Sequence, residues 1–88
     1  MKTLFFIEVT DTFCGEANFS WSTRHIIRAS TMRGAVNKFS RLSSMTWRKD
    51  YGDAWNARYN SKSGATCYFI RRYEADYDSE FSYHTDER

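Results

Sequence analysis

Proline is absent from the 88-residue sequence, and glycine and cysteine are scarce, with four and two residues. The four scattered glycines form no glycine-rich loop that would hold a phosphate group. Cys14 and Cys67 are too few for a disulfide scaffold and belong to no Cys-x-x-Cys pair, so we expect two reduced thiols, with a single bridge as the alternative. No apolar run approaches the roughly 18 residues that cross a membrane as a helix, so we expect no membrane partner.

The sequence opens on an apolar run that is too short for a secretory signal. Such a signal needs about 7–15 apolar residues after its positive end. Here the run that follows Lys2 extends only from Leu4 to Ile7, because Glu8 interrupts it. We therefore expect a first β-strand at this end, and a cytoplasmic protein with an intact N-terminus.

Aromatic residues, in contrast, are plentiful: they make up 18% of the chain, within a hydrophobic content of 41%. Intrinsic disorder is disfavoured by this content, because disordered chains are poor in aromatic residues. A chain of 88 residues can form one domain with a small core. We expect residues 1–88 to form that single domain.

Hydrophobic periodicity predicts four strands and one helix. Alternating apolar and polar residues predict strands over residues 3–9, 18–29, 54–59 and 65–73. Between the second and third strands, apolar residues recur at helical spacing from Met32 to Leu42, after an N-cap at Ser30 or Thr31. Residues 45–53 are ambiguous between a short strand and a turn. The expected fold is α+β, in ββαββ order, with an antiparallel sheet of about four strands and the helix packed on one face.

Charge is distributed unevenly behind a formal net charge of only +2. Residues 24–72 carry eleven Lys and Arg against two acidic residues, whereas residues 74–88 form an acidic C-terminal tail that could include a short edge strand near Phe81 to Tyr83. A basic centre can attract phosphate groups or acidic surfaces, and its alternative role is an ordinary solvated face. The candidate partner-binding residues of this basic surface are Arg24, Arg28, Arg33, Lys38, Arg41, Arg71 and Arg72.

The acidic tail allows three interpretations. It could keep the protein in solution, fold back over the basic surface, or present phosphate-like charge to a basic partner. Its candidate partner-binding residues are Asp76, Asp78, Glu80, Asp86 and Glu87.

Groups that could carry catalysis are few. His25 lies on the aromatic-rich face of its strand and is expected to pack there, and His84 lies in the polar tail and is expected to be solvated. Two histidines and two isolated cysteines have no zinc-ligand spacing. Asp50 and Asp53 flank a Tyr-Gly turn and suit turn hydrogen bonding better than magnesium binding. We expect no enzyme activity, no cofactor and no metal.

Residues 26–39, Ile-Ile-Arg-Ala-Ser-Thr-Met-Arg-Gly-Ala-Val-Asn-Lys-Phe, form a predicted strand that turns through Ala-Ser into a short helix. This layout, together with the size and uneven charge of the chain, resembles small phage-encoded proteins that include anti-CRISPR proteins. The resemblance implies a non-enzymatic inhibitor in the host cytoplasm that binds a CRISPR effector complex and blocks nucleic-acid access. It implies no site residues, because that class shares no common site motif.

Two mechanisms fit such an inhibitor. The acidic tail could occupy a channel of Lys and Arg in the effector complex, or the basic surface could grip an acidic protein surface or the guide backbone. The alternative function is direct binding of single-stranded RNA or DNA by Arg24, Arg28, Arg71 and Arg72 with neighbouring rings. The sequence leaves a monomer or a homodimer open, and a third hypothesis is a regulatory homodimer formed through an exposed sheet edge.

Overall fold

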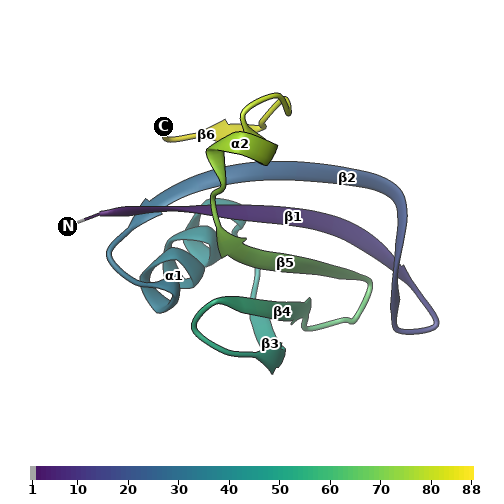
Figure 1. Ribbon diagram of the computed structural model, residues 1–88. Coiled ribbons are helices and arrows are strands. Elements are labelled where there is room, and N and C mark those ends of the chain that lie inside the picture. The colour runs from purple at the N-terminus through teal and green to yellow at the C-terminus, as the bar shows by residue number, and fades with distance from the viewer. Residues whose placement is uncertain (1) are drawn as a thin grey trace.

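A computed structural model describes residues 2–88 and places six strands in a single sheet. In chain order the elements are β1 (Thr3–Phe13), β2 (Glu16–Ala29), α1 (Met32–Ser43), β3 (Trp47–Gly52), β4 (Asn56–Ser61), β5 (Thr66–Arg72), α2 (Ala75–Asp78) and β6 (Thr85–Asp86). The strand order across the sheet is β3-β4-β5-β1-β2-β6 (Figure 1). Neighbouring strands are antiparallel except for β2 and β6, which run parallel.

The expected four-stranded sheet in ββαββ order with a single helix is wrong, because the sheet is mixed and has six strands and the chain has a second short helix. The two additional strands are the two edges. β3 consists mostly of exposed polar and charged residues and lacks alternation, and β6 has only two residues. Both are defined by hydrogen bonds to a neighbouring strand rather than by a pattern of their own. The predicted edge strand near Phe81 to Tyr83 is displaced to Thr85–Asp86.

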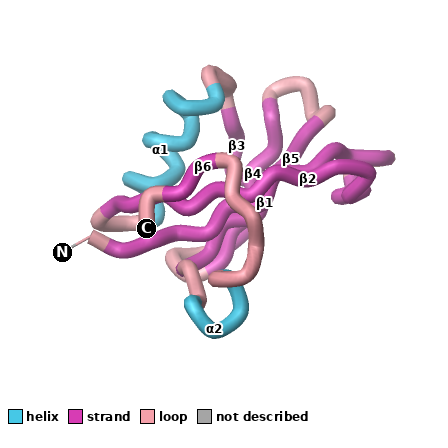
Figure 2. Tube along the Cα trace, turned by 90° about the horizontal axis from the view of Figure 1, so that it is seen from above, coloured by secondary structure: helices cyan, strands magenta, loops and turns pink. Residues whose placement is uncertain are grey.

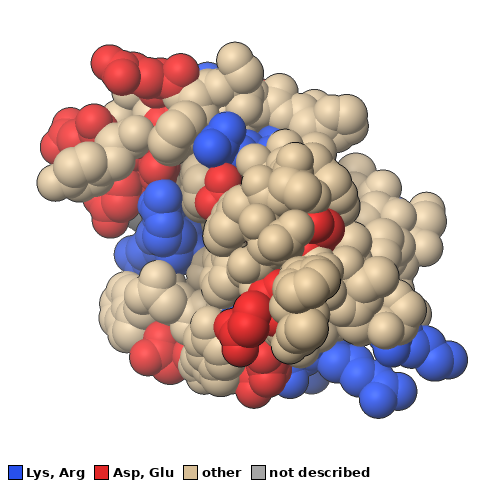
Figure 3. Space-filling view, turned by 90° about the vertical axis from the view of Figure 1, so that its right-hand side faces the viewer, with Lys and Arg blue, Asp and Glu red and all other residues tan. Residues whose placement is uncertain are grey.

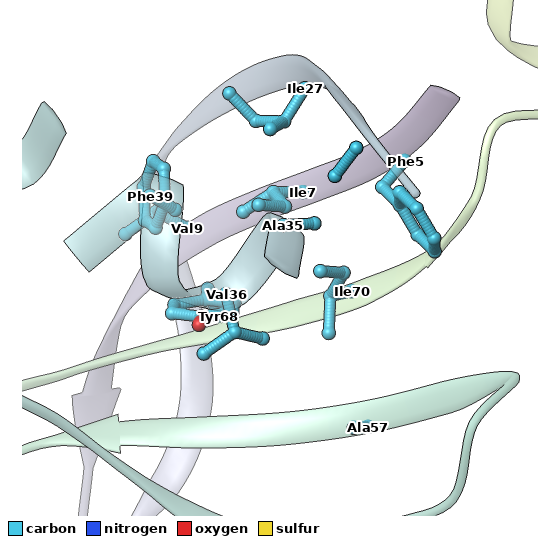
Figure 4. Close-up of a cluster of buried hydrophobic side chains, with 11 residues drawn as sticks. Phe5, Ile7, Val9, Ile27, Ala35, Val36, Phe39, Ala57, Tyr68 and Ile70 are labelled. Atoms are coloured by element: carbon cyan, nitrogen blue, oxygen red, sulfur yellow. The ribbon is translucent and has the colours of Figure 1, made fainter. Parts of the chain in front are cut away.

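The core lies between the sheet and α1. β1 occupies the middle of the sheet and directs Phe5, Ile7 and Val9 to one face, where they meet α1 (Figure 4). The helix contributes its buried residues Ala35, Val36 and Phe39, and Thr31 caps it by accepting a hydrogen bond from the backbone N–H of Gly34 at 3.1 Å. The buried residues of α1 recur with the 3.6-residue period of a helix, so the observed range of α1 is close to the range predicted from the sequence.

The opposite face of the sheet is covered by the C-terminal residues. Figure 2 shows α1 and α2 on opposite sides of the sheet. The rings of Phe81 and Tyr83 pack on Phe6 of β1, with centroids 6.3 and 6.1 Å away. Phe6 and Ile26 are therefore buried although they point away from α1, which explains why β1 and β2 carry apolar residues on both faces.

An irregularity interrupts the β1–β2 hairpin beyond Thr10. Phe19 adopts a left-handed backbone conformation with φ 54°, which a non-glycine residue reaches only at a cost. Side chains of β1 hold it there: the hydroxyl of Thr10 accepts from the Phe19 N–H at 2.8 Å, and Asp11 accepts from the Ser20 N–H at 2.9 Å. The ring of Phe19 then stacks on Phe69, while Trp21 lies on the α1 side of the sheet.

Candidate functional site

An apolar groove of about 340 Å³ lies on the α1 face of the sheet, beside the C-terminal end of the helix. We call it the α1 groove. β1 and β5 contribute Val9 and Thr66 to it, and the end of α1 contributes Phe39, Leu42 and Ser43. The remaining lining residues come from β2, from β6 and the residue before it, from the α1–β3 connection and from the start of β3: Trp21, Thr23, His25, His84, Thr85, Met45 and Trp47.

Three large apolar side chains of the α1 groove remain exposed to solvent. The exposed fractions are 44% for Trp21, 54% for Leu42 and 41% for Met45. Leu42 belongs to the last turn of α1, which ends at Ser43. Trp21 lies on the same face of β2 as Thr23 and His25, because alternate residues of a strand share a face, and it lines the same groove.

His25 is buried at the β6 end of the α1 groove and is held in place by two hydroxyls. Its Nε2 and Nδ1 atoms each lie 3.0 Å from a threonine hydroxyl, those of Thr23 and Thr85. The imidazole ring packs against Phe39 and, edge to face, against His84, with centroids 4.9 and 5.6 Å away. Burial, with a smaller contribution from the charge of His84, lowers the pKa of His25 to about 4. His25 therefore lines the α1 groove as a neutral imidazole ring that is packed against its neighbours.

Sequence reasoning placed some of these residues correctly and missed others. The predicted packing of His25 agrees with its burial, and the expected solvation of His84 agrees with its exposure, although the contact of His84 with His25 was not predicted. Leu42 continued the apolar helix pattern and so suggested core, yet it is an exposed residue at the α1 groove. Met45 and Trp47 fell in the ambiguous segment. Among the lining residues, the aromatic Trp21, Phe39 and Trp47 were the composition signal for a groove.

The predicted basic surface is neutralised in part by the chain itself. Arg24 pairs with Glu8 at 3.2 Å, and Lys38 pairs with Glu87 at 2.9 Å. Arg28 donates from its guanidinium to the carbonyl of Glu87 at 3.0 Å and from its backbone N–H to the carboxylate of Glu87 at 2.6 Å. Arg28 and Lys38 are thus brought together around one glutamate.

Arg71 is also occupied. It donates two hydrogen bonds of 2.8 Å to the carboxylate of Asp78, and its guanidinium lies 4.2 Å from the ring centre of Phe6. Within residues 2–88, no ion pair involves the other four predicted residues, Arg28, Arg33, Arg41 and Arg72. Arg33 and Arg41 are exposed on α1, and Arg72 lies over Trp55, 4.8 Å from its ring centre. The predicted basic residues therefore do not form one free surface.

The acidic tail folds back over this basic region, which was one of its three interpretations. Asp78 is almost completely buried, and hydrogen bonds from Arg71 are the main cause of the lowered pKa of its carboxyl group. Asp86 pairs with Arg88 at 2.7 Å, and Glu87 holds Arg28 and Lys38. Asp76 and Glu80 are exposed and belong to no ion pair among the described residues. Figure 3 shows acidic side chains gathered at the top of the molecule, where Figure 1 places α2.

The remaining chemistry of the described chain is limited. Cys14 is exposed, Cys67 is buried, and both are free thiols. Residues 2–88 contain no cluster of three or more His, Cys, Asp or Glu side chains arranged to hold a metal ion. None of the helices described in this range has the length and apolarity needed to cross a membrane.

Comparisons with known proteins identify no relative of this chain. No family model matches the chain, and neither a curated protein nor a solved structure matches it.

Proposed function

We propose that this chain is a non-enzymatic binding protein that takes up an apolar group of a protein partner in its α1 groove. The observation that carries the proposal is the exposure of Trp21, Leu42 and Met45 around one hollow. Buried apolar surface contributes roughly 25 cal/mol per Å², and large apolar side chains around a concavity are the usual anchors of protein interfaces. A contiguous apolar site of this kind on a small domain marks an interaction surface.

The lining of the α1 groove favours a protein over a nucleic acid. Among the described residues that line it, none is Lys or Arg, whereas nucleic-acid binding depends on cations that neutralise phosphate groups. Three of the seven basic residues that the sequence suggested for that role, Arg24, Lys38 and Arg71, are paired with acidic residues of the same chain. A partner with an apolar anchor therefore fits better than a phosphate backbone.

For the identity of the partner, the resemblance of residues 26–39 and of the whole layout to anti-CRISPR proteins supports a CRISPR effector complex in the host cytoplasm. Docking through the α1 groove would then block access of the nucleic acid to that complex. The exposed acidic residues Asp76 and Glu80 lie on the other side of the sheet and would influence the association rate rather than anchor the complex.

The test uses purified effector complexes immobilised on a biosensor, with the purified chain as analyte. Trp21→Ala and Leu42→Ala should each weaken binding at least tenfold, because each removes an anchor of the α1 groove. Tyr77→Ala is the matched control, since Tyr77 is 78% exposed on α2 and far from the groove in the fold. Binding of both groove variants at wild-type strength, or binding of no effector complex, would contradict the proposal.

A second candidate, binding of single-stranded RNA or DNA, is supported by the contact between Arg72 and Trp55. Trp55 is 58% exposed, and an arginine over an exposed indole is a common arrangement where bases stack. This candidate predicts salt-sensitive binding of labelled oligonucleotides in fluorescence anisotropy, lost in Trp55→Ala and Arg72→Ala and retained in Trp21→Ala. Anisotropy that stays constant at low salt would remove it.

A further inference from the structure

We propose that the outer edge of β2 at residues 24–28 is a docking site for an extended acidic segment of a protein partner, and that residues 84–88 occupy this site in the free chain. We call it the β2 edge site. It lies at the border of the sheet, where β6 runs beside β2 (Figure 1). The inference goes beyond the proposed function, because it concerns a strand edge and not the α1 groove.

The segment that lies on the β2 edge site shows which backbone groups the site binds. The carbonyl of Arg24 accepts a hydrogen bond from the N–H of His84 at 2.8 Å. The carbonyl of Ile26 accepts from the N–H of Glu87 at 3.1 Å, and the N–H of Arg28 donates to the carboxylate of Glu87 at 2.6 Å. A strand that is added to a sheet edge through its backbone is a common mode of peptide recognition.

Two cations give the β2 edge site a preference for an acidic residue. The ammonium group of Lys38 lies 2.9 Å from the carboxylate of Glu87, and the guanidinium of Arg28 donates to the carbonyl of Glu87 at 3.0 Å. Two residues earlier in the chain, the hydroxyl of Thr85 lies 3.0 Å from Nδ1 of His25. The matching ligand is therefore an extended segment with a hydroxyl residue two positions before a glutamate.

Residues 84–88 are held on the β2 edge site mainly by polar contacts. None of them is an apolar residue, none is buried, and their strand pairing with β2 extends only over His25 and Ile26. The preceding part of the tail is anchored by the buried Asp78 and by aromatic rings packed on Phe6. A polar chain end of this kind opens locally at low cost while the rest of the molecule stays folded.

A partner segment can make contacts that residues 84–88 do not make. β2 begins at Glu16, and within residues 2–88 no strand lies beside the outer edge of β2 before Arg24. Backbone groups alternate in direction along a strand, so Ser22 presents its N–H and C=O groups to the same side as Arg24. A longer strand can therefore continue the pairing to Ser22, and an uncovered edge of this kind readily adds a strand.

The test is an NMR titration of the isotope-labelled full chain with a synthetic peptide that has the sequence of residues 82–88, followed by the amide resonance of Arg28. Glu87→Ala leaves the β2 edge site intact and weakens its occupant, so this variant should bind the peptide at least about fivefold more tightly than the wild-type chain. Asp86→Ala is the matched control and should bind like the wild-type chain, because Asp86 pairs with Arg88 and with neither cation of the site. A peptide with Gln in place of Glu87 should bind the Glu87→Ala chain more weakly.

Hydrogen exchange of the wild-type chain measures whether residues 84–88 open without global unfolding. The amides of His84 and Glu87 should exchange at least about tenfold faster than the amide of Ile7, which lies in the central strand β1. Equal protection of these amides would show that residues 84–88 leave β2 only when the whole chain unfolds, and would overturn the proposal.

The titration can also overturn the proposal while the proposed function stands. Equal affinity of the Glu87→Ala and wild-type chains, equal binding of the Glu and Gln peptides, or absence of shifts would each contradict a β2 edge site for acidic segments. Dimerisation of Glu87→Ala without peptide, detected by size-exclusion chromatography, would assign the edge to a second copy of the chain in place of a partner protein. Loss of effector binding in Trp21→Ala would still support the α1 groove in each of these cases.

Discussion

At the scale of single residues, His25 connects the α1 groove to the C-terminal strand. It is 7% exposed, and its ring shares hydrogen bonds with Thr23 on its own strand and with Thr85 on β6. A protonated ring in this position would be a buried charge that faces His84 and the aromatic ring of Phe39. The folded state therefore excludes the proton that an unfolded chain would bind.

This exclusion predicts a pH-dependent stability. Burial lowers the pKa of His25 from 6.5 to about 4, so between these values the unfolded chain binds a proton that the folded chain does not. The free energy of unfolding should therefore fall by up to about 3 kcal/mol as pH drops from 6.5 to 4. Urea unfolding at a series of pH values measures this loss. His25→Gln should flatten the curve in this window, and a variant that keeps the wild-type slope would contradict the account.

Asp78 is the second residue whose surroundings predict a measurable effect. It is buried, accepts two hydrogen bonds from Arg71 and accepts one from the backbone N–H of Glu74 at 2.8 Å. Asp78→Ala should lower the free energy of unfolding by about 2–3 kcal/mol, because Arg71 and the Glu74 N–H lose their acceptor. Asp86→Ala breaks an exposed pair with Arg88 and should cost at most about 1 kcal/mol. Equal losses in the two variants would argue against a structural role for the buried pair.

At the scale of elements, the close approach of β3 to β4 depends on one glycine. Gly52 has φ 123°, and a Cβ atom there would overlap the Cα of Ala57 and the carbonyl oxygen of Asn56. Gly52→Ala should therefore cost about 3 kcal/mol or more and disrupt the β3–β4 pairing. Gly64→Ala is the control, because Gly64 also has a positive φ of 80° but open space around it, so about 1–2 kcal/mol is expected. Thermal unfolding of both variants checks the difference, and equal melting temperatures would contradict it.

The same elements show how far the sequence determines the fold. α1 and the four inner strands carry their own periodicity, because each buries a regular set of side chains against the core. β3 and β6 carry none, since each is completed by the hydrogen bonds of a neighbouring strand. The α1 groove could be predicted only in part: Trp21 and Phe39 follow strand and helix patterns, whereas Leu42 also follows the helix pattern, which predicts burial, and is exposed.

At the scale of the whole molecule, the chain joins its two oppositely charged regions to each other. Glu87 holds Arg28 and Lys38, which are 59 and 49 residues away in the sequence, and Asp78 holds Arg71. The sequence indicated both charged regions and offered this fold-back as one of three interpretations, but not which residues pair, because ion pairs between distant segments depend on the completed fold. The charge available to a partner is consequently smaller than the sequence suggests.

This internal neutralisation predicts how the protein binds a polyanion. Glu87→Gln and Glu80→Gln raise the formal net charge equally, from +2 to +3, but only the first removes a carboxylate that pairs with the ammonium group of Lys38. Glu87→Gln should therefore elute from a heparin column at higher salt than Glu80→Gln, because Lys38 loses its charged partner and can bind a sulfate group, whereas the control leaves every ion pair intact. Elution of both variants at the same salt concentration would show that Lys38 is already available in the wild-type protein, and that Glu87 does not shield it.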